Sequence, residues 1–301
     1  QVSVFLCANV TIVFLNISVS IYMKNFLIAC AILLTLSACS TSSTGRNQVS
    51  LYSDAELNHM GVTSFENMKK EIPISKDRAT NEFVLCVADA ITANVPKSAH
   101  PGDWEVVVFD SEQVNAFALP GGKIGVYAGI LNVTENQDQL AAIMGHEVGH
   151  VLEHHSNERL SANKLSNVGL AVAAIALGAS EVENKGLWVA GLGIGVQYGV
   201  IMPYSRSHES EADIVGQELM ARSGFSPEAS IQLWENMSKL SKDAPPEFMS
   251  THPSNETRIK QLNKHLVVSQ PYYFAEKSSG NLPKCVKPKI IPKPKAQTKT
   301  K

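Results

Sequence analysis

Residues 141–155 contain four histidines in a segment whose apolar residues have helical spacing. On a helix, His146 and His150 point to the same side because they are four positions apart, so both can bind one metal ion. Glu147 follows the first histidine, where its carboxylate can reach a water at the metal without binding the metal itself. This H-E-x-x-H pattern is a strong signal for a zinc peptidase. A helix with surface histidines is the alternative.

Two further histidines lie in the same segment. His154 continues the row that His146 and His150 begin, but it lies too far along the helix axis to bind the same ion. We therefore interpret His154 and His155 as structural or surface residues.

A catalytic zinc site needs a third protein ligand and an open position for water. The segment S-R-S-H-E-S-E-A-D offers Glu209, Glu211 and Asp213. Glu209 and Asp213 share a helix face, whereas Glu211 is expected to point away. One carboxylate can then bind zinc while the other accepts the free ring N–H of a ligand histidine. A solvated acidic helix start is the alternative.

Such a site suits peptide hydrolysis, in which the electrophile and the nucleophile are both weak. Zinc lowers the pKa of a bound water toward ~7 and polarises the scissile carbonyl. Glu147 then takes the proton and later delivers it to the leaving amine.

The elements that position these residues are expected to be mostly helical. The turn at residues 120–122 joins two β-branched strands, and a third strand precedes them. We predict an α+β fold, mostly α-helical, with a small antiparallel sheet beside the active-site helix. The expected strands cover residues 104–109, 114–119 and 123–127, and the expected helices cover residues 54–68, 79–95, 136–159, 209–223, 226–240 and 254–266.

Five motifs in this order resemble a zincin-like metallopeptidase family, the one that includes HtpX and the CAAX prenyl endopeptidase. Among its members the chain is most similar to the periplasmic BepA/LoiP-like lipoprotein peptidases. The likeness covers residues 47–266 and rests on N-A-F-A-L-P-G-G, H-E-V-G-H-V-L-E-H-H-S-N-E-R-L-S, Y-S-R-S-H-E-S-E-A-D, A-R-S-G-F and T-H-P-S-N-E-T-R-I. It implies one Zn²⁺ per chain, bound by His146, His150 and Glu209. It also implies that Glu147 is the base and that Asp213 supports the ligands.

The resemblance also assigns roles outside the H-E-x-x-H segment. It leaves two roles open for His252, which either stabilises the reaction oxyanion or occupies the open position of the metal in a resting state. Arg258 would orient the substrate or the metal-bound water. A substrate peptide could add as a further strand to the edge strand of the sheet, along Asn115, Ala116, Phe117 and Ala118.

Residues 1–38 read as upstream sequence followed by a signal peptide that starts at Met23. The string L-S-A-C resembles a bacterial lipobox, in which Cys39 is lipidated, and the absence of aspartate at Ser40 favours the outer membrane. An N-terminal transmembrane anchor is the alternative. A polar tether, residues 39–50, would link the lipid to a metallopeptidase domain at residues 51–270.

Two cysteines remain after this segment, Cys86 and Cys285, and an oxidising compartment makes a disulfide between them plausible, with two unpaired thiols as the alternative. Residues 271–301 form a Pro/Lys-rich tail. The uncharged stretch 186–203 is expected to form two mobile helices over the cleft, and a membrane hairpin is the alternative.

The charge of the chain and its predicted location limit the classes of partner that we expect. Between Cys39 and Leu282 the chain has 18 basic and 28 acidic residues, which argues against nucleic-acid binding. We expect a zinc metalloendopeptidase that faces the periplasm, is bound to the membrane through its lipid, and cleaves misfolded or unassembled envelope proteins. The alternative is a chaperone or assembly factor for outer-membrane proteins in which proteolysis is latent or secondary.

Overall fold

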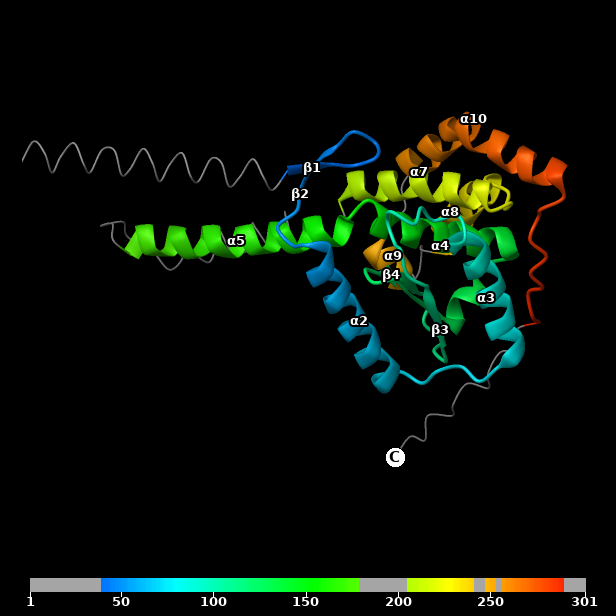
Figure 1. Ribbon diagram of the computed structural model, residues 1–301, viewed down its shortest axis with the longest axis horizontal. Coiled ribbons are helices and arrows are strands. Elements are labelled where there is room, and N and C mark those ends of the chain that lie inside the picture. The colour runs from blue at the N-terminus through cyan, green and yellow to red at the C-terminus, as the bar shows by residue number, and fades with distance from the viewer. Residues whose placement is uncertain (1–38, 179–204, 241–246, 253–255, 290–301) are drawn as a thin grey trace, which may run out of the picture. The chain divides into compact units, whose positions relative to one another are not determined.

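The computed structural model describes residues 39–178, 205–240, 247–252 and 256–289, and the chain divides into two compact units after Leu51 (Figure 1). In the first unit, β1 (Cys39–Thr41) and β2 (Asn47–Val49) form an antiparallel hairpin, in the stretch expected to be a tether. The predicted signal peptide at residues 1–38 and the whole uncharged stretch 186–203 lie outside the described residues.

The second unit is built from three strands and a larger number of helices. Its first two helices are α2 (Asp54–Glu71) and α3 (Arg78–Thr92). The start of α2 is fixed by a reciprocal cap, because Ser53 Oγ accepts from the Glu56 backbone N–H at 3.3 Å and the Ser53 backbone N–H donates to Glu56 Oε2 at 2.8 Å. The remaining helices are α4 (Gln137–Leu152), α5 (His155–Gly178), α7 (Arg206–Arg222), α8 (Glu228–Leu240), α9 (Glu247–Thr251) and α10 (Glu256–Ser279).

The three strands form a sheet in the order β3–β5–β4, where β3 is Glu105–Phe109, β4 is Ala116–Leu119 and β5 is Lys123–Tyr127. The expected antiparallel pairing holds for β4 and β5, whose tight turn uses Gly121 and Gly122 at φ values of 84° and 68°. The expectation was wrong for β3, which pairs with β5 in parallel. Because β5 inserts between the two earlier strands, β4 is left at the edge of the sheet.

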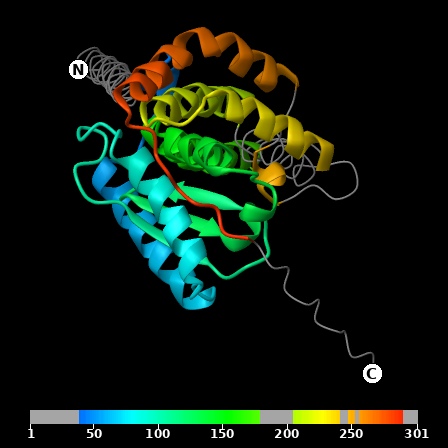
Figure 2. The same ribbon diagram turned by 90° about the vertical axis from the view of Figure 1, so that its right-hand side faces the viewer.

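Figure 2 shows α4 between two layers, with α7 and α10 on one side and the sheet with α2 and α3 on the other. The main apolar core fills the space around α4. A smaller aromatic cluster of Phe65, Phe109 and Tyr127 lies on the other face of the sheet, against α2. No helix in the described ranges combines the length and the apolar character needed to span a bilayer.

Two helix boundaries differ from expectation. The helix predicted at residues 136–159 is broken after Leu152, because His154 adopts a left-handed backbone conformation at φ 52°. The helix predicted to end at residue 266 continues to Ser279, through Pro271, so part of the expected tail is helical. Next to that proline, the guanidinium carbon of Arg222 in α7 lies 3.5 Å from the centre of the Tyr272 ring.

The C-terminal segment after α10 is bound to the unit. Cys285 forms a disulfide with Cys86 of α3. Beside it, the side chain of Gln137 accepts from the Cys285 N–H at 2.7 Å and donates to the Pro283 carbonyl at 3.0 Å. This segment therefore fastens the start of α4 to α3.

α4 and α7 cross with their backbones in direct contact. A Cβ added to Gly145 would lie 2.7 Å from the carbonyl oxygen of Gly216, and one added to Gly216 would lie 2.6 Å from the backbone nitrogen of His146. One turn along, a Cβ on Gly149 would lie 2.9 Å from the carbonyl oxygen of Ala212. Only glycine permits this approach, which brings the polar start of α7 opposite the H-E-x-x-H segment.

We predict that Gly216→Ala lowers the free energy of unfolding by about 1–3 kcal/mol, because the helices must separate. It should also weaken metal binding, since α7 moves away from α4. Thermal unfolding and zinc titration measure the two effects. Gly102→Ala is the matched control, because its Cβ would meet only the side chain of His100. Wild-type stability and zinc affinity in Gly216→Ala would contradict the close-contact role.

Candidate metal centre

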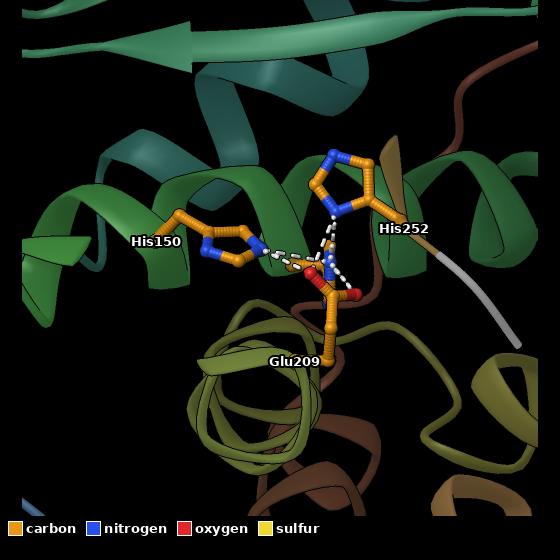
Figure 3. A group of neighbouring side chains, drawn as sticks. His150, Glu209 and His252 are labelled. Atoms are coloured by element: carbon orange, nitrogen blue, oxygen red, sulfur yellow. Dashed lines mark hydrogen bonds and ion pairs between the residues drawn. The ribbon is translucent and has the colours of Figure 1, made fainter. Parts of the chain in front are cut away.

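Four buried side chains bring possible metal-binding atoms within 4.8 Å of one another. His146 and His150 come from α4, Glu209 from the first turn of α7, and His252 from the residue after α9. Figure 3 shows the carboxylate of Glu209 directed at the rings of His150 and His252. The structure thus brings together the predicted ligands, and His252, expected either to stabilise the oxyanion or to occupy the open position of the metal, lies among them.

The spacing of these atoms suits a tetrahedral ion. Metal–nitrogen bonds of about 2.0–2.1 Å place tetrahedral ligands about 3.3 Å apart. His146 Nε2 lies 3.1 Å from His150 Nε2, 3.2 Å from His252 Nδ1 and 3.5 Å from Glu209 Oε2. A single ring nitrogen carries at most one proton and cannot hydrogen-bond to three neighbours at once. One cation can bind all four groups, so the residues fit a metal.

A buried ion pair supports His146 at Nδ1, the ring nitrogen that does not face the other ligands. Its Nδ1 lies 3.0 Å from Asp213 Oδ1, so the N–H at this position can donate to the carboxylate. Arg258 donates to both oxygens of Asp213, at 2.6 and 2.7 Å, and its Nη1 lies 2.8 Å from Glu209 Oε2. The guanidinium also stacks on Trp234 at 3.9 Å. Asp213 therefore lies behind His146, where the resemblance placed a supporting residue, and Arg258, expected to orient the substrate or the metal-bound water, contacts the carboxylates of Asp213 and Glu209.

His150 has a different support. Its Nδ1 lies 2.8 Å from His155 Nδ1, and His155 Nε2 lies 2.9 Å from Glu211 Oε2. The expectation that Glu211 points away was wrong, since it is 4% exposed and lies under the centre. The helix break at His154 turns His155 inward, so one of the two histidines set aside in the sequence is buried while His154 remains exposed.

Glu147 is buried beside the four ligands. Its helix packs against β4, where the backbone of Ala118 favours the charged form of the carboxylate. Its Oε1 lies 3.5 Å from His252 Nε2 and has no hydrogen-bond partner among the described residues. Burial raises the pKa of Glu147, although the nearby histidines oppose the shift. A carboxylate of raised pKa is suited to accept a proton and release it again.

The remaining pKa shifts follow from burial and the carboxylates. Burial lowers the pKa of His146, but Asp213 and Glu209 outweigh it and raise this pKa to about 9. Burial, and after it the positive charge of His146, hold the pKa of His150 well below its usual value. Burial opposes ionisation of Glu209 and Asp213, yet His146 and Arg258 keep both pKa values low. The carboxylates are therefore charged and ready to bind a cation.

The predicted substrate strand lies next to the centre. Ala116 and Ala118 are buried toward α4, and Asn115 precedes β4. Phe117 faces the other side of the sheet, where its ring packs with Phe65 and Phe109. Its side chain therefore belongs to the aromatic cluster, and only its backbone could contact a substrate.

Loss of the Asp213 charge should weaken metal binding. We predict that Asp213→Asn lowers zinc affinity about 10–100-fold, because the ring of His146 loses its anionic partner. Competition with a chelator measures this. Glu218→Gln is the control. Glu218 lies on the same helix, but its carboxylate pairs with His265 at a distance of 3.0 Å and not with any of the four ligands. Equal zinc affinity in both variants would contradict the role of Asp213.

Comparison with known proteins identifies the family. The model of Peptidase family M48 matches residues 77–266. Similar proteins include the mitochondrial metalloendopeptidase OMA1 of Schizosaccharomyces pombe, 34% identical over 171 residues, which are 56% of this chain and 48% of that protein. The beta-barrel assembly-enhancing protease of Yersinia pestis is 27% identical over 231 residues, 72% of this chain and 47% of that protein.

The same beta-barrel assembly-enhancing protease from Escherichia coli strain K12 is 24% identical over 229 residues, 74% of this chain and 46% of that protein. The chain thus spans about half the length of the curated relatives it matches. The family match covers more than half of the chain and includes all four candidate metal ligands. The chain belongs to peptidase family M48.

Proposed function

We propose that this protein is a zinc-dependent endopeptidase that cleaves unfolded or unassembled proteins of the bacterial envelope. The observation that carries the proposal is the buried cluster of His146, His150, Glu209 and His252, with the carboxylate of Glu147 beside it. Membership of peptidase family M48 and the names of the relatives as a metalloendopeptidase and a protease support the same chemistry.

Zinc is the metal that suits this donor set. Two or three imidazoles and a carboxylate, without sulfur, are typical of catalytic zinc sites. His146, His150 and Glu209 would hold the ion, and His252 lies where the fourth ligand belongs. When bound, zinc activates a water and polarises the peptide carbonyl.

Glu147 would move the proton. Its Oε1 has no hydrogen-bond partner among the described residues and lies on the side of His252, so it can accept a proton from the attacking water. The backbone of Ala118 in β4 favours the charged form of this carboxylate. The raised pKa lets the same group return the proton to the leaving amine.

His252 and Arg258 would have different tasks. His252 Nδ1 lies 3.1 Å from Glu209 Oε1, in the cluster itself, so His252 must withdraw before a substrate carbonyl can take its place. After withdrawal it could donate to the oxyanion. Arg258 is 1% exposed and pairs with Asp213 and Glu209, which supports a role in orienting the ligands in place of the expected role toward the substrate or the metal-bound water.

An unfolded substrate fits the edge strand. β4 lies at the edge of its sheet and packs against α4, the helix that carries Glu147. A peptide that pairs with β4 must be extended, and its backbone then passes the proposed base. Folded proteins rarely offer such a segment, whereas unassembled ones do.

The envelope location is part of the proposal. The lipobox-like L-S-A-C before Ser40 supports lipidation of Cys39, with membrane attachment through the lipid. The disulfide between Cys86 and Cys285 fits an oxidising compartment such as the periplasm. One relative is named for beta-barrel assembly, which supports a substrate among outer-membrane proteins, while another is named as mitochondrial.

We predict that Glu147→Gln retains zinc but loses hydrolysis of an unfolded model protein by at least about 10²-fold, because the side chain keeps its shape and loses its basicity. The measurement is the cleavage rate at equal zinc content. Glu209→Ala is the paired variant, and it should lose zinc as well as activity. Cleavage by Glu147→Gln at the wild-type rate would contradict the assignment of the base.

A further inference from the structure

The ring of His155 is completely buried and has three neighbours that fix its position. Its Nδ1 lies 2.8 Å from His150 Nδ1, and its Nε2 lies 2.9 Å from Glu211 Oε2. Its face stacks on the ring of His208, with centroids 4.4 Å apart. His208 is in turn paired with Glu158 at 2.9 Å. These contacts leave the His155 ring little freedom to turn.

The contact between His150 and His155 decides where His150 carries its proton. Two Nδ1 atoms 2.8 Å apart form a hydrogen bond only when one donates and the other accepts. If His155 donated, the proton of a neutral His150 would lie on Nε2 and point into the ligand cluster. If His150 donates, its Nε2 presents a lone pair to the cluster, as metal binding requires.

Glu211 selects between these two states. An ionised carboxylate only accepts hydrogen bonds, so His155 must donate from Nε2. A neutral His155 with its proton on Nε2 has a bare Nδ1, and this atom can only accept. The proton of His150 is therefore drawn to Nδ1, away from the metal side.

We propose that His155 and Glu211 are positioning residues for His150, which fix its tautomer and ring orientation for metal binding. The proposal rests on the proposed function. It gives each ligand histidine of α4 its own anionic support from α7: Asp213 contacts His146 directly, and Glu211 acts on His150 through His155. The three alternating acids of α7, with Glu209 as a ligand, thereby take three separate roles.

The test compares zinc affinity in variants of the full chain, by competition with a chelator. His155→Leu removes the acceptor and should weaken zinc binding about 10–100-fold. His155→Gln offers a carbonyl acceptor and an amide donor in one side chain, so it should recover most of that loss. His265→Leu is the matched control, because His265 pairs with Glu218 of α7 at 3.0 Å without contacting a ligand histidine. It should bind zinc as the unsubstituted chain does.

A wild-type zinc affinity in folded His155→Leu would overturn the proposal, as would equal losses in His155→Leu and His265→Leu. If His155→Leu does not fold, Glu211→Leu provides the second variant, with the same expected loss and the same contrary result. Long-range ¹H–¹⁵N spectra of the unsubstituted zinc-loaded chain test the tautomers directly. They should show a proton on His150 Nδ1 and on His155 Nε2, and a His155 proton on Nδ1 would overturn the proposal.

Failure of the proposed function would give a different pattern. In that case the unsubstituted chain would not bind zinc tightly, or Glu147→Gln would cleave as fast as the unsubstituted chain. The positioning proposal fails instead when the unsubstituted chain binds zinc and cleaves, and His155→Leu binds zinc equally well.

Discussion

The contact between the backbones of α4 and α7 is the constraint on which the rest of the site depends. Gly145 and Gly216 let the two helices touch, and a methyl group on Gly216 would collide with the backbone nitrogen of His146. At this separation a carboxylate from the first turn of α7 reaches two imidazoles of α4 within 3.5 Å. A wider crossing would leave the histidines and Glu209 too far apart for one ion.

The contact between α4 and α7 also brings several charged side chains together in the core, and no single ion pair neutralises all of them. The carboxylates of Glu147, Glu209 and Asp213 are buried together with the guanidinium of Arg258 and the ring of His146, whose raised pKa lets it carry a proton until a metal takes its place. Isolated buried charges cost several kcal/mol each, so an excess of negative charge in the core is unfavourable unless a cation offsets it. A divalent metal supplies that charge, which links metal binding to the stability of the α4–α7 contact.

Much of the centre could be predicted from local spacing. His146 and His150 share a face of α4, and Glu209 and Asp213 share a face of α7. The helical period of 3.6 residues therefore predicts both pairs. The role of His155 could not be predicted this way, because it depends on a helix break. His154 takes a positive φ that nothing in the local pattern signals, and an unbroken helix would have turned His155 elsewhere.

The fold shows the same division between local and long-range information. The hairpin of β4 and β5 follows from its glycine turn, whereas the parallel pairing of β3 depends on where β5 inserts. α10 continues through Pro271, where a local pattern predicts a break, and next to it Arg222 of α7 contacts the ring of Tyr272. Such contacts join distant parts of the chain, and a single sequence does not show them.

X-ray absorption at the zinc edge of the zinc-loaded full chain is the most direct test of the metal centre. If α4 and α7 build the site described above, zinc should have four nitrogen or oxygen neighbours at about 2.0–2.1 Å, with imidazole scattering from at least two histidines. A sulfur neighbour, or fewer than two imidazoles, would contradict a centre formed by His146, His150 and Glu209.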